Sequence, residues 1–459
     1  MKQLLKHGTV VSGVGCCKKD ILIENGIIRE VSPEICDGEA QVVDAKGKLI
    51  FPGFIDAHTH MDLPVAGTVT ADDFYSGTRA AVAGGTTCIV DFATQYKGET
   101  LEEALENWNK KAEGRCSCDY GFHMAISDLE GAGETQVQAM IDAGVSTFKL
   151  YMTYPDMLLR DGELYRILKQ LKKQGGIAGV HCENAEVIDA LTAEAKAAGH
   201  LGPDTHPRVR PAGLEAEAVN RLLAIAKEAD APVIVVHLTC WEAFAKIQRA
   251  RARGQIVFAE TCPQYLLLDE SCYKKNGFEA AKYVCSPPLR KKVDQECLWE
   301  ALKTGDIQTV STDHCSFTLA QKEMGKEDFT KIPNGMPGVE TRGVLLYTYG
   351  VEEGRMTLEE MCRVLSENPA KLYGMYPKKG CLEPGSDADL VILDPHKPGI
   401  IQAKTQEYNM DYAPFEGWKL KGTIDKVYLR GNLVVDQGKV VSEKQGQYIS
   451  RGKYQTDFN

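Results

Sequence analysis

The sequence predicts an α/β protein: a closed (β/α)₈ barrel with a β-sandwich-like module formed from both ends of the chain. Through the middle of the 459 residues, short apolar runs alternate with longer amphipathic ones, as in a parallel sheet covered by helices. Eight apolar runs can be counted, which is the number of strands that closes such a barrel. Short strands separated by Gly and Asn turns recur near both termini, where no helical pattern interrupts them.

The two ends of the chain are predicted to form one discontinuous β-rich module. Residues 20–24 and 26–31 flank Asn25-Gly26, a strong signal for a hairpin. The same texture returns near the C-terminus, at residues 389–394, 426–429 and 433–435. We therefore expect the module to comprise residues 1–52 and 376–459, with the barrel between them at 53–375. The final ten residues are polar and predict a solvated, flexible tail.

The barrel is expected to contain eight strand–helix units. The strand candidates are residues 49–58, 86–94, 119–126, 145–153, 176–183, 232–239, 255–261 and 308–314. Helical patterns fall between them, at residues 101–111, 163–173, 215–227, 241–252 and 293–303. An open doubly wound sheet is the alternative, but no Gly-x-Gly-x-x-Gly follows the first strand to form a nucleotide crevice.

Composition excludes several classes of partner. Lys plus Arg total 53 and Asp plus Glu total 64, so the formal charge is −11. Nucleic acids and anionic membranes both require a basic surface, and we therefore expect neither as a partner. No run of about 18 apolar residues is present to span a bilayer. We therefore expect a soluble, acidic protein.

Cysteine usage indicates a reducing compartment. Fifteen cysteines in 459 residues are about 3% of the chain, far below a disulfide scaffold. Several lie inside apolar runs, as Cys88 does, and are typical of buried reduced thiols. The N-terminus is broken by charged residues before a secretory apolar core forms. Together these features predict a cytoplasmic protein.

Metal-binding residue types gather where the predicted strands end. These residues are His58 and His60 after the first strand, Lys149 in the fourth, His181 in the fifth, His237 in the sixth and Asp313 in the eighth. Side chains at the carboxyl ends of barrel strands line the site that this architecture uses for chemistry. Any one of these histidines would more often be a hydrogen-bonded core residue, but four of only ten histidines share this placement.

The other six histidines serve as a comparison set. We expect His7, His200, His206 and His396 to be solvated surface groups in turns and loops. His123, in the middle of a strand, is expected to be a core residue or to support the site. His314 directly follows Asp313.

Lys149 lies between Phe148 and Leu150 in a strand, where an unpaired ammonium is costly. It would also repel the metal ions that the histidines attract. A neutral amine can add carbon dioxide to give a carbamate, whose two anionic oxygens could bridge two divalent metals. The lysine thus predicts a carboxylated bridging ligand.

The sequence resembles the amidohydrolase superfamily, in its dihydropyrimidinase/hydantoinase branch, over essentially its whole length. The motifs that carry the resemblance are Asp56-Ala57-His58-Thr59-His60, Phe148-Lys149-Leu150-Tyr151, His181-Cys182-Glu183-Asn184, Ser286-Pro287-Pro288-Leu289-Arg290, Thr312-Asp313-His314-Cys315 and Asn334-Gly335-Met336-Pro337-Gly338. As a set these motifs are highly specific. The resemblance implies a metal-dependent cyclic amidohydrolase that opens a 5-substituted hydantoin or a dihydropyrimidine to an N-carbamoyl amino acid.

The resemblance also implies residue roles. His58, His60 and Asp313 would hold one metal ion, His181 and His237 a second, and carboxylated Lys149 would bridge them. Zinc is the expected metal, although manganese or iron remains open. A hydroxide bridging the metals would attack the ring amide, with Asp313 transferring the proton and Tyr154 stabilising the oxyanion. Ser286 and Asn334 would bind the ring edge, and a homotetramer or dimer is implied.

Alternatives within and outside the family remain open. Met61 and Asp62 follow His60 where a dihydroorotase-like enzyme would carry an Arg, and Asp62 would repel a substrate carboxylate. An allantoinase-like hydrolase or a non-catalytic scaffold protein of the same fold are the competing functions. The apolar segment 151–159 would form the wall of the substituent pocket, and it leaves an aryl hydantoin and a dihydropyrimidine at near even odds.

Overall fold

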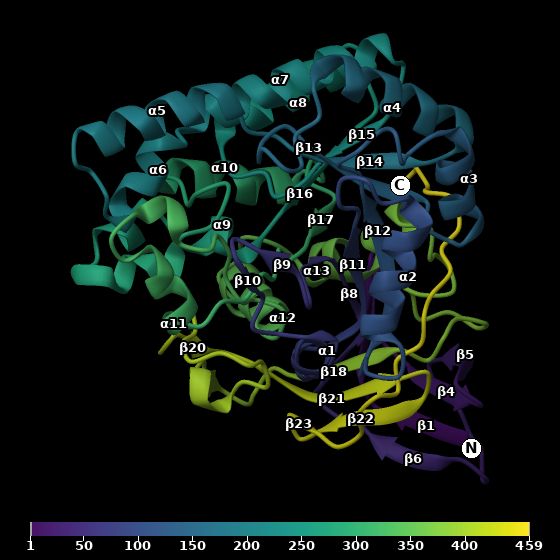
Figure 1. Ribbon diagram of the computed structural model, residues 1–459. Helices are drawn as coiled ribbons and strands as arrows, with labels where there is room; N and C mark the ends of the chain where they lie inside the picture. The colour runs from purple at the N-terminus through teal and green to yellow at the C-terminus, as the bar shows by residue number, and fades with distance from the viewer. Residues whose placement is uncertain (1, 459) are drawn as a thin grey trace.

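The computed structural model describes residues 2–458 and has an eight-stranded parallel sheet at its centre (Figure 1). In order around the sheet the strands are β8 (Phe54–Thr59), β11 (Thr86–Thr94), β12 (Asp119–Ala125), β13 (Thr147–Tyr151), β14 (Ile177–His181), β15 (Val233–Val235), β16 (Val257–Thr261) and β17 (Thr309–Val310). Its two edges meet where Thr59 forms a parallel bridge with His314 and the His60 N–H donates to the His314 carbonyl at 2.8 Å. The predicted (β/α)₈ barrel is confirmed.

Helices surround the barrel as an outer layer (Figure 1). They are α1 (Phe74–Ala83), α2 (Leu101–Ala112), α3 (Glu134–Asp142), α4 (Asp161–Gln174), α5 (Ala185–Ala197), α7 (Ala212–Glu228), α8 (Trp241–Arg251) and α10 (Lys292–Lys303). In α2, Thr100 caps the first turn by accepting from the Glu103 N–H, while Leu105 and Trp108 are buried. The five helices expected from periodicity are all present, because their apolar stripes face the sheet.

Shorter helices occupy the connections and the end of the barrel. They are α6 (His206–Val209), α9 (Pro263–Leu267), α11 (Leu319–Lys322), α12 (Arg342–Leu345), α13 (Leu358–Cys362) and α14 (Asn368–Leu372). Single-turn and π-helical segments accompany them, namely η1 (Pro203–Thr205), η2 (Glu270–Lys274), η3 (Gly277–Tyr283), η4 (Glu323–Gly325), η5 (Phe329–Lys331), η6 (Leu346–Val351), η7 (Arg363–Glu367) and η8 (Ala403–Thr405).

The two ends of the chain pair with each other in two further sheets. A seven-stranded sheet has the order β23 (Lys439–Val440), β22 (Asn432–Asp436), β21 (Thr423–Leu429), β18 (Leu390–Asp394), β7 (Leu49–Pro52), β2 (Thr9–Ser12) and β3 (Gly15–Lys18). A four-stranded sheet has the order β5 (Ile27–Ser32), β4 (Asp20–Glu24), β1 (Lys2–Lys6) and β6 (Gln41–Asp44). Two small hairpins add β9 (Pro64–Val65) with β10 (Thr68–Val69), and β19 (Gly399–Ile400) with β20 (Lys419–Leu420).

The predicted first barrel strand, residues 49–58, is wrong as a single strand. The chain divides at Gly53, so that β7 pairs with β18 in the terminal sheet and only β8 enters the barrel. Gly53 donates its N–H to the Asp389 carbonyl at 2.8 Å, and a Cβ there would lie 2.0 Å from Thr87 Oγ1. The apolar run is continuous in the sequence because β7, which is buried in the terminal sheet, is followed after one residue by β8, which is buried in the barrel.

The predicted flexible tail is also wrong within the described residues. The C-terminal segment, yellow in Figure 1, runs back along the barrel and inserts Arg451, which is only 3% exposed. Its guanidinium donates to the carbonyls of Phe122 and Tyr373 and, at 2.8 Å, to Thr147 Oγ1. These barrel acceptors explain how a polar tail is ordered.

A buried ionic cluster joins the barrel to the terminal module. Lys379 Nζ lies 2.7 Å from Asp119, 2.6 Å from Asp389 and 3.1 Å from Asp387. Asp119 begins β12 and also pairs with Arg430, which follows β21. The three carboxylates resemble a cation site, but the Lys379 ammonium already lies among them and Arg430 pairs with Asp119.

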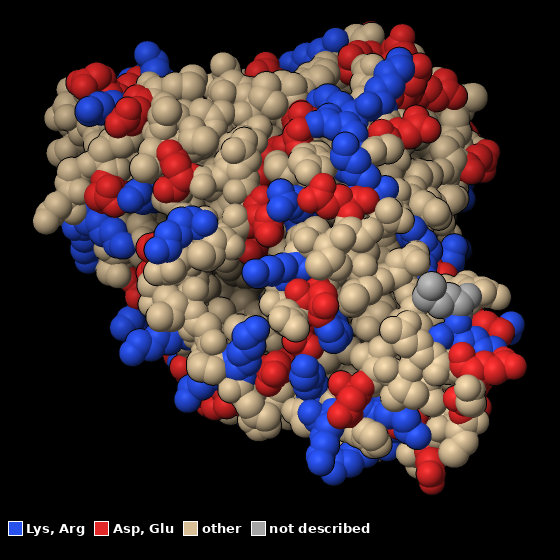
Figure 2. Space-filling model, turned by 90° about the horizontal axis from the view of Figure 1, so that it is seen from below, with Lys and Arg blue, Asp and Glu red and all other residues tan. Residues whose placement is uncertain are grey.

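On the face seen from below, Lys and Arg side chains are interspersed with Asp and Glu rather than gathered in one patch (Figure 2). Among residues 2–458, no helix combines the length and apolarity needed to cross a membrane.

Candidate metal centre and active site

The six predicted ligands all lie at or beside the carboxyl ends of barrel strands. His58 is in β8 and His60 follows it, Lys149 is in β13, and His181 ends β14. His237 and Asp313 lie beyond β15 and β17, which are shorter than predicted. Their φ angles of 39° and 51° are left-handed, so the backbone leaves the ladder and turns both side chains. Such backbone strain in non-glycine residues is typical of functional sites.

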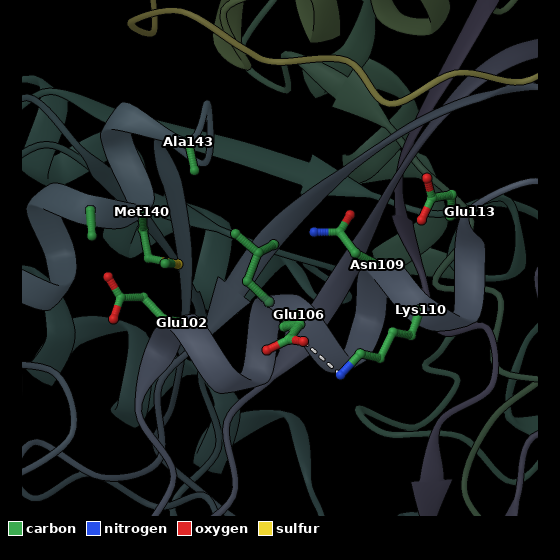
Figure 3. Close-up of a pocket in the computed structure, with 9 residues that line it drawn as sticks. Glu102, Glu106, Asn109, Lys110, Glu113, Met140 and Ala143 are labelled. Atoms are coloured by element: carbon green, nitrogen blue, oxygen red, sulfur yellow. Dashed lines mark ion pairs between the residues drawn. The ribbon is translucent and has the colours of Figure 1, made fainter.

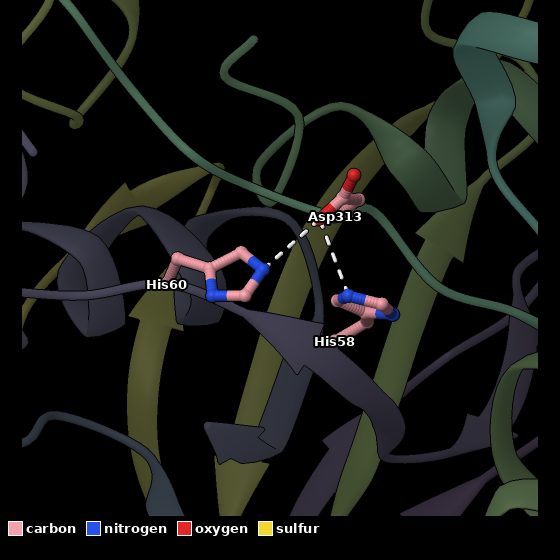
Figure 4. A group of neighbouring side chains, drawn as sticks. All are labelled: His58, His60 and Asp313. Atoms are coloured by element: carbon pink, nitrogen blue, oxygen red, sulfur yellow. Dashed lines mark hydrogen bonds and ion pairs between the residues drawn. The ribbon is translucent and has the colours of Figure 1, made fainter. Parts of the chain in front are cut away.

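His58, His60 and Asp313 form the tightest group (Figure 4). One carboxylate oxygen, Asp313 Oδ1, lies 3.2 Å from His58 Nε2 and 3.1 Å from His60 Nε2. One ligand atom from each residue can be chosen such that all lie within 4.8 Å of one another. Two imidazoles and one carboxylate at this spacing suit a divalent transition metal.

Lys149, His181 and His237 extend this group across the barrel mouth. Lys149 Nζ lies 3.4 Å from His58 Nε2. The rings of His181 and His237 are 4.5 Å apart between centroids, and His237 is 5.4 Å from His58. The structure therefore brings all six predicted residues into one connected cluster, in which burial and the charge of Lys149 lower the pKa values of His58, His181 and His237.

Burial determines the charge state of these groups. The pKa values of His58 and His237 are held well below the usual value, first by burial and further by nearby cations including Lys149. Burial also lowers the pKa of Lys149 to about 8, although Asp313 and Glu260 oppose it. Neutral imidazoles present lone pairs, which is the form that binds metals.

The hydrogen bonds around the histidines fit metal binding. His58 Nδ1 contacts Glu260 Oε1 at 2.6 Å, and His181 Nε2 contacts Glu183 Oε2 at 2.7 Å. A carboxylate on one ring nitrogen fixes the tautomer and leaves the other nitrogen as a metal ligand. Within the described chain, the buried Nδ1 atoms of His60 and His237 have no hydrogen-bond partner. The donor set thus fits two divalent cations.

Sequence reasoning missed the carboxylates that orient these histidines. Glu260 is fully buried in β16, and Glu183 is held by both His181 and Arg210, the latter at 2.6 Å. A charged residue within the apolar strand 255–261 was the available signal for Glu260. Arg210 lies far from Glu183 in the sequence, and no pattern indicated it.

Tyr154 and Ser286 lie together beside the cluster. Tyr154 follows β13 with a φ of 67°, and its ring centroid is 5.2 Å from that of His181. Burial raises the pKa of Tyr154, while a hydrogen bond with Ser286 acts in the opposite direction. The tyrosine therefore stays a neutral hydroxyl that can donate a hydrogen bond.

Asn334 lies on the segment next to Ser286 and is half-buried. The two segments are joined because the Gly335 N–H donates to the Val284 carbonyl at 3.0 Å. Gly335 has a φ of 151°, and a Cβ there would lie 2.3 Å from the Cys315 carbonyl, so only glycine fits.

The prediction that His206 is a surface group is wrong. Its ring is 3% exposed and Nε2 donates to the Cys285 carbonyl at 2.8 Å, with Ser286 Oγ 3.5 Å away. The loop 198–211 gave no apolar pattern that would mark a buried residue. His123 is buried as expected, with Nε2 donating to the Ala57 carbonyl at 2.9 Å.

The segment 151–159, which contains Tyr154, is not uniformly exposed enough to form a pocket wall. Tyr151, Met157 and Leu158 are half-buried, whereas Leu159 is only 3% exposed and packs into the main core. The N–H groups of Met157 and Leu158 donate to the Tyr154 carbonyl at 2.9 and 2.8 Å, so this segment folds back over the tyrosine.

A separate hollow lies between α2 and α3 on the outer helical layer (Figure 3). Its walls include Met140 and the Glu106–Lys110 ion pair, which is 2.7 Å long and exposed. It contains none of the residues at the strand ends, and a pair of solvated helix surfaces explains it.

Comparison with known proteins assigns the family. The model of the amidohydrolase family matches residues 49–434. This chain belongs to the amidohydrolase family. It is 46% identical to a D-hydantoinase of Geobacillus stearothermophilus, over 99% of this chain and 97% of that protein. It is 40% identical to a D-phenylhydantoinase of Escherichia coli, over 98% of each chain.

Solved structures agree with the fold of this amidohydrolase. The crystal structure of a dihydropyrimidinase from Brevibacillus agri superposes with a TM-score of 0.97 and 42% identity, covering 99% of both chains. The match includes both the barrel and the terminal sheets, since almost no residue of either chain is left out.

Proposed function

We propose that this amidohydrolase opens a cyclic amide, either a 5-substituted hydantoin or a dihydropyrimidine, to give an N-carbamoyl amino acid. The observation that carries the proposal is the single cluster formed by the six strand-end side chains, with Tyr154 beside it. The 46% identity to a D-hydantoinase, over 99% of this chain, supports a hydantoin or a related ring as the substrate.

The proposed metal centre uses two sets of ligands. His58, His60 and Asp313 would hold one divalent cation, and His181 with His237 a second. Lys149 would be the bridge as N6-carboxylysine, formed when its neutral amine bonds to the carbon of CO₂ and releases one proton. Zinc suits this set of imidazole and carboxylate ligands. Two such cations would supply Lewis-acid activation of water and of the ring carbonyl.

The protein's own groups would move protons and hold charge. Burial opposes ionisation of Asp313, but His58 and His60 lower its pKa to about 2, so the side chain is a carboxylate that carries no proton of its own. It would take the proton from the attacking water and deliver it to the leaving ring nitrogen. The Tyr154 hydroxyl would donate to the developing oxyanion.

Ser286 and Asn334 would hold the ring. The imide or ureide edge of either ring is planar and presents both donors and acceptors, which main-chain groups on adjoining segments can pair. Tyr151, Met157 and Leu158 offer a half-buried, largely apolar surface nearby, which favours an apolar or hydrogen substituent over a charged one.

The test is ring opening by zinc-loaded protein supplied with bicarbonate. Equal concentrations of 5-phenylhydantoin, dihydrouracil and allantoin are compared by quantifying the carbamoyl products. We expect turnover of the first two, and their ratio assigns the preferred ring. Turnover of allantoin alone would replace this substrate class, and absence of any turnover with two metals bound would reject the proposal.

We further infer a cytoplasmic homo-oligomer, a dimer or tetramer. All fifteen cysteines are free thiols and most are buried, which suits a reducing compartment. Trp241 and Val293 are 48% and 60% exposed, and they lie on α8 and α10, two helices that are in contact. We infer that this exposed apolar surface is where a second copy of the chain packs. Light scattering during size-exclusion chromatography measures the assembly, and a monomer at micromolar concentration would contradict it.

A further inference from the structure

Lys322, the last residue of α11, is a fully buried cation at the wall of the proposed substrate site. Its Nζ donates to the carbonyls of Val284, Pro333 and Gly335 at 3.0, 2.6 and 2.8 Å. An ammonium has three N–H donors and no acceptor, so three carbonyls satisfy it completely. Its side chain is 0% exposed.

No carboxylate within residues 2–458 forms an ion pair with Lys322. The groups near it are the thiols of Cys285 and Cys315 and the ring of Phe317, whose centroid lies 5.6 Å from Nζ. Burial lowers the pKa of Lys322 to about 7. An isolated buried cation is costly, and here the three carbonyl dipoles offset that cost. Because its three partners are backbone carbonyls, Lys322 holds backbone segments in place and does not balance a negative charge.

The three carbonyls belong to the two segments that carry Ser286 and Asn334. Pro333 and Gly335 flank Asn334 on either side, and Val284 is two residues before Ser286. Val284 also accepts from the Gly335 N–H, so Lys322 reinforces a contact that already joins the segments. One side chain thus holds both proposed ring-binding elements.

The hydrogen bond to Pro333 also reaches Asn334 electronically. The Pro333 carbonyl and the Asn334 N–H are the two ends of one peptide unit, and a cation at the oxygen makes the N–H a stronger donor. Within the described chain, Asn334 itself forms no hydrogen bond, although its neighbours are fixed. Its N–H is therefore free to donate to a bound molecule.

We propose that Lys322 is a positioning residue for the substrate ring. Its ammonium sets the separation of segments 284–286 and 333–335 and polarises the Asn334 N–H toward a ring carbonyl oxygen. The inference rests on the proposed function only in taking these segments as the ring-binding elements. Lys322 has no role in the chemical step, and the metal ligands do not touch it.

The test compares substitutions that differ in the number of donors. Lys322→Met keeps the length and removes all three donors, while Lys322→Gln retains two. Lys326→Met, four residues later and exposed, is the matched control. We expect KM for dihydrouracil to rise about tenfold in Lys322→Met and less in Lys322→Gln, with kcat within about threefold and two metals retained.

The outcomes separate this inference from the proposed function. Absence of ring opening by the wild-type holoenzyme rejects the proposed function before any variant is considered. With wild-type turnover present, an unchanged KM in Lys322→Met overturns the positioning role. Loss of metal or an equal fall in kcat also overturns it, because a general structural defect would produce that. If Lys322→Met does not fold, Lys322→Gln decides by the same criteria.

Discussion

Two buried lysines, Lys149 and Lys379, lie near opposite ends of the barrel strands in contrasting surroundings. Lys379 is ringed by the carboxylates of Asp119, Asp387 and Asp389, which hold its pKa well above the usual value despite burial. Lys149 faces His58 at 3.4 Å, and burial lowers its pKa to about 8. A buried lysine surrounded by carboxylates stays charged and links parts of the fold through ion pairs. A buried lysine beside imidazoles loses its proton more easily, and its neutral amine can then react.

The comparison predicts its largest effect at Lys149. Lys149→Ala removes the bridge between the metals, so we expect two-metal binding to be lost and turnover to fall by at least about 10³-fold, or about 4 kcal/mol. Metal content by mass spectrometry and the ring-opening rate measure this. Retention of two metals with full turnover would reject the carbamate.

At Lys379 the loss should appear in stability. Lys379→Met leaves Asp387 and Asp389 without their cation and Asp119 with Arg430 alone, and we expect the free energy of unfolding to fall by about 3 kcal/mol. Urea denaturation of the metal-loaded protein measures it. The folded fraction should keep its metal and its kcat. A loss of activity at unchanged stability would contradict a purely structural role for Lys379.

Tyr154→Phe tests chemistry at the mouth without removing a ligand. The variant lacks the donor to the oxyanion, so kcat should fall about 100-fold, which is about 2.7 kcal/mol. Metal content should remain that of the wild type. An unchanged kcat would remove Tyr154 from this role.

The smallest effect is expected where a carboxylate orients a histidine. Glu260→Gln weakens the contact with His58 Nδ1, and we expect metal affinity to fall about tenfold. Competition with a chelator measures the affinity. Glu228→Gln, at the exposed end of α7, is the control and should bind metal as the wild type does. Equal affinity in both variants would show that Glu260 does not support the ligand.

Much of the site could be read from the sequence because strand ends are marked by local pattern. His58, Lys149 and Asp313 each follow or interrupt an apolar run, and a closed barrel brings such positions together. Residues that reach the site from short helices in the connections, such as His206 in α6 and Lys322 in α11, have no comparable mark. Their burial depends on which backbone groups the tertiary structure presents to them.

The boundaries of the fold were less predictable for a related reason. Apolarity shows that residues 49–58 are buried but does not distinguish which sheet buries them, so one unbroken barrel strand was expected although the domain boundary was placed at residue 53. Arg451 reads as a surface residue until its barrel acceptors are known. Hydrophobic periodicity indicates which residues of a segment are buried. Which other segment they pack against depends on contacts between residues that are hundreds of positions apart in the sequence.

The pairing of β7 with β18 also constrains how the chain can be made. Ile50 pairs with Ile392, which a ribosome synthesises about 340 residues later. At a translation rate of about 5–20 residues per second, β18 is synthesised roughly 20 to 70 seconds after β7. During that interval the edge of β7 is open to other chains, so production of this protein should respond to translation speed and to chaperones that shield nascent strands.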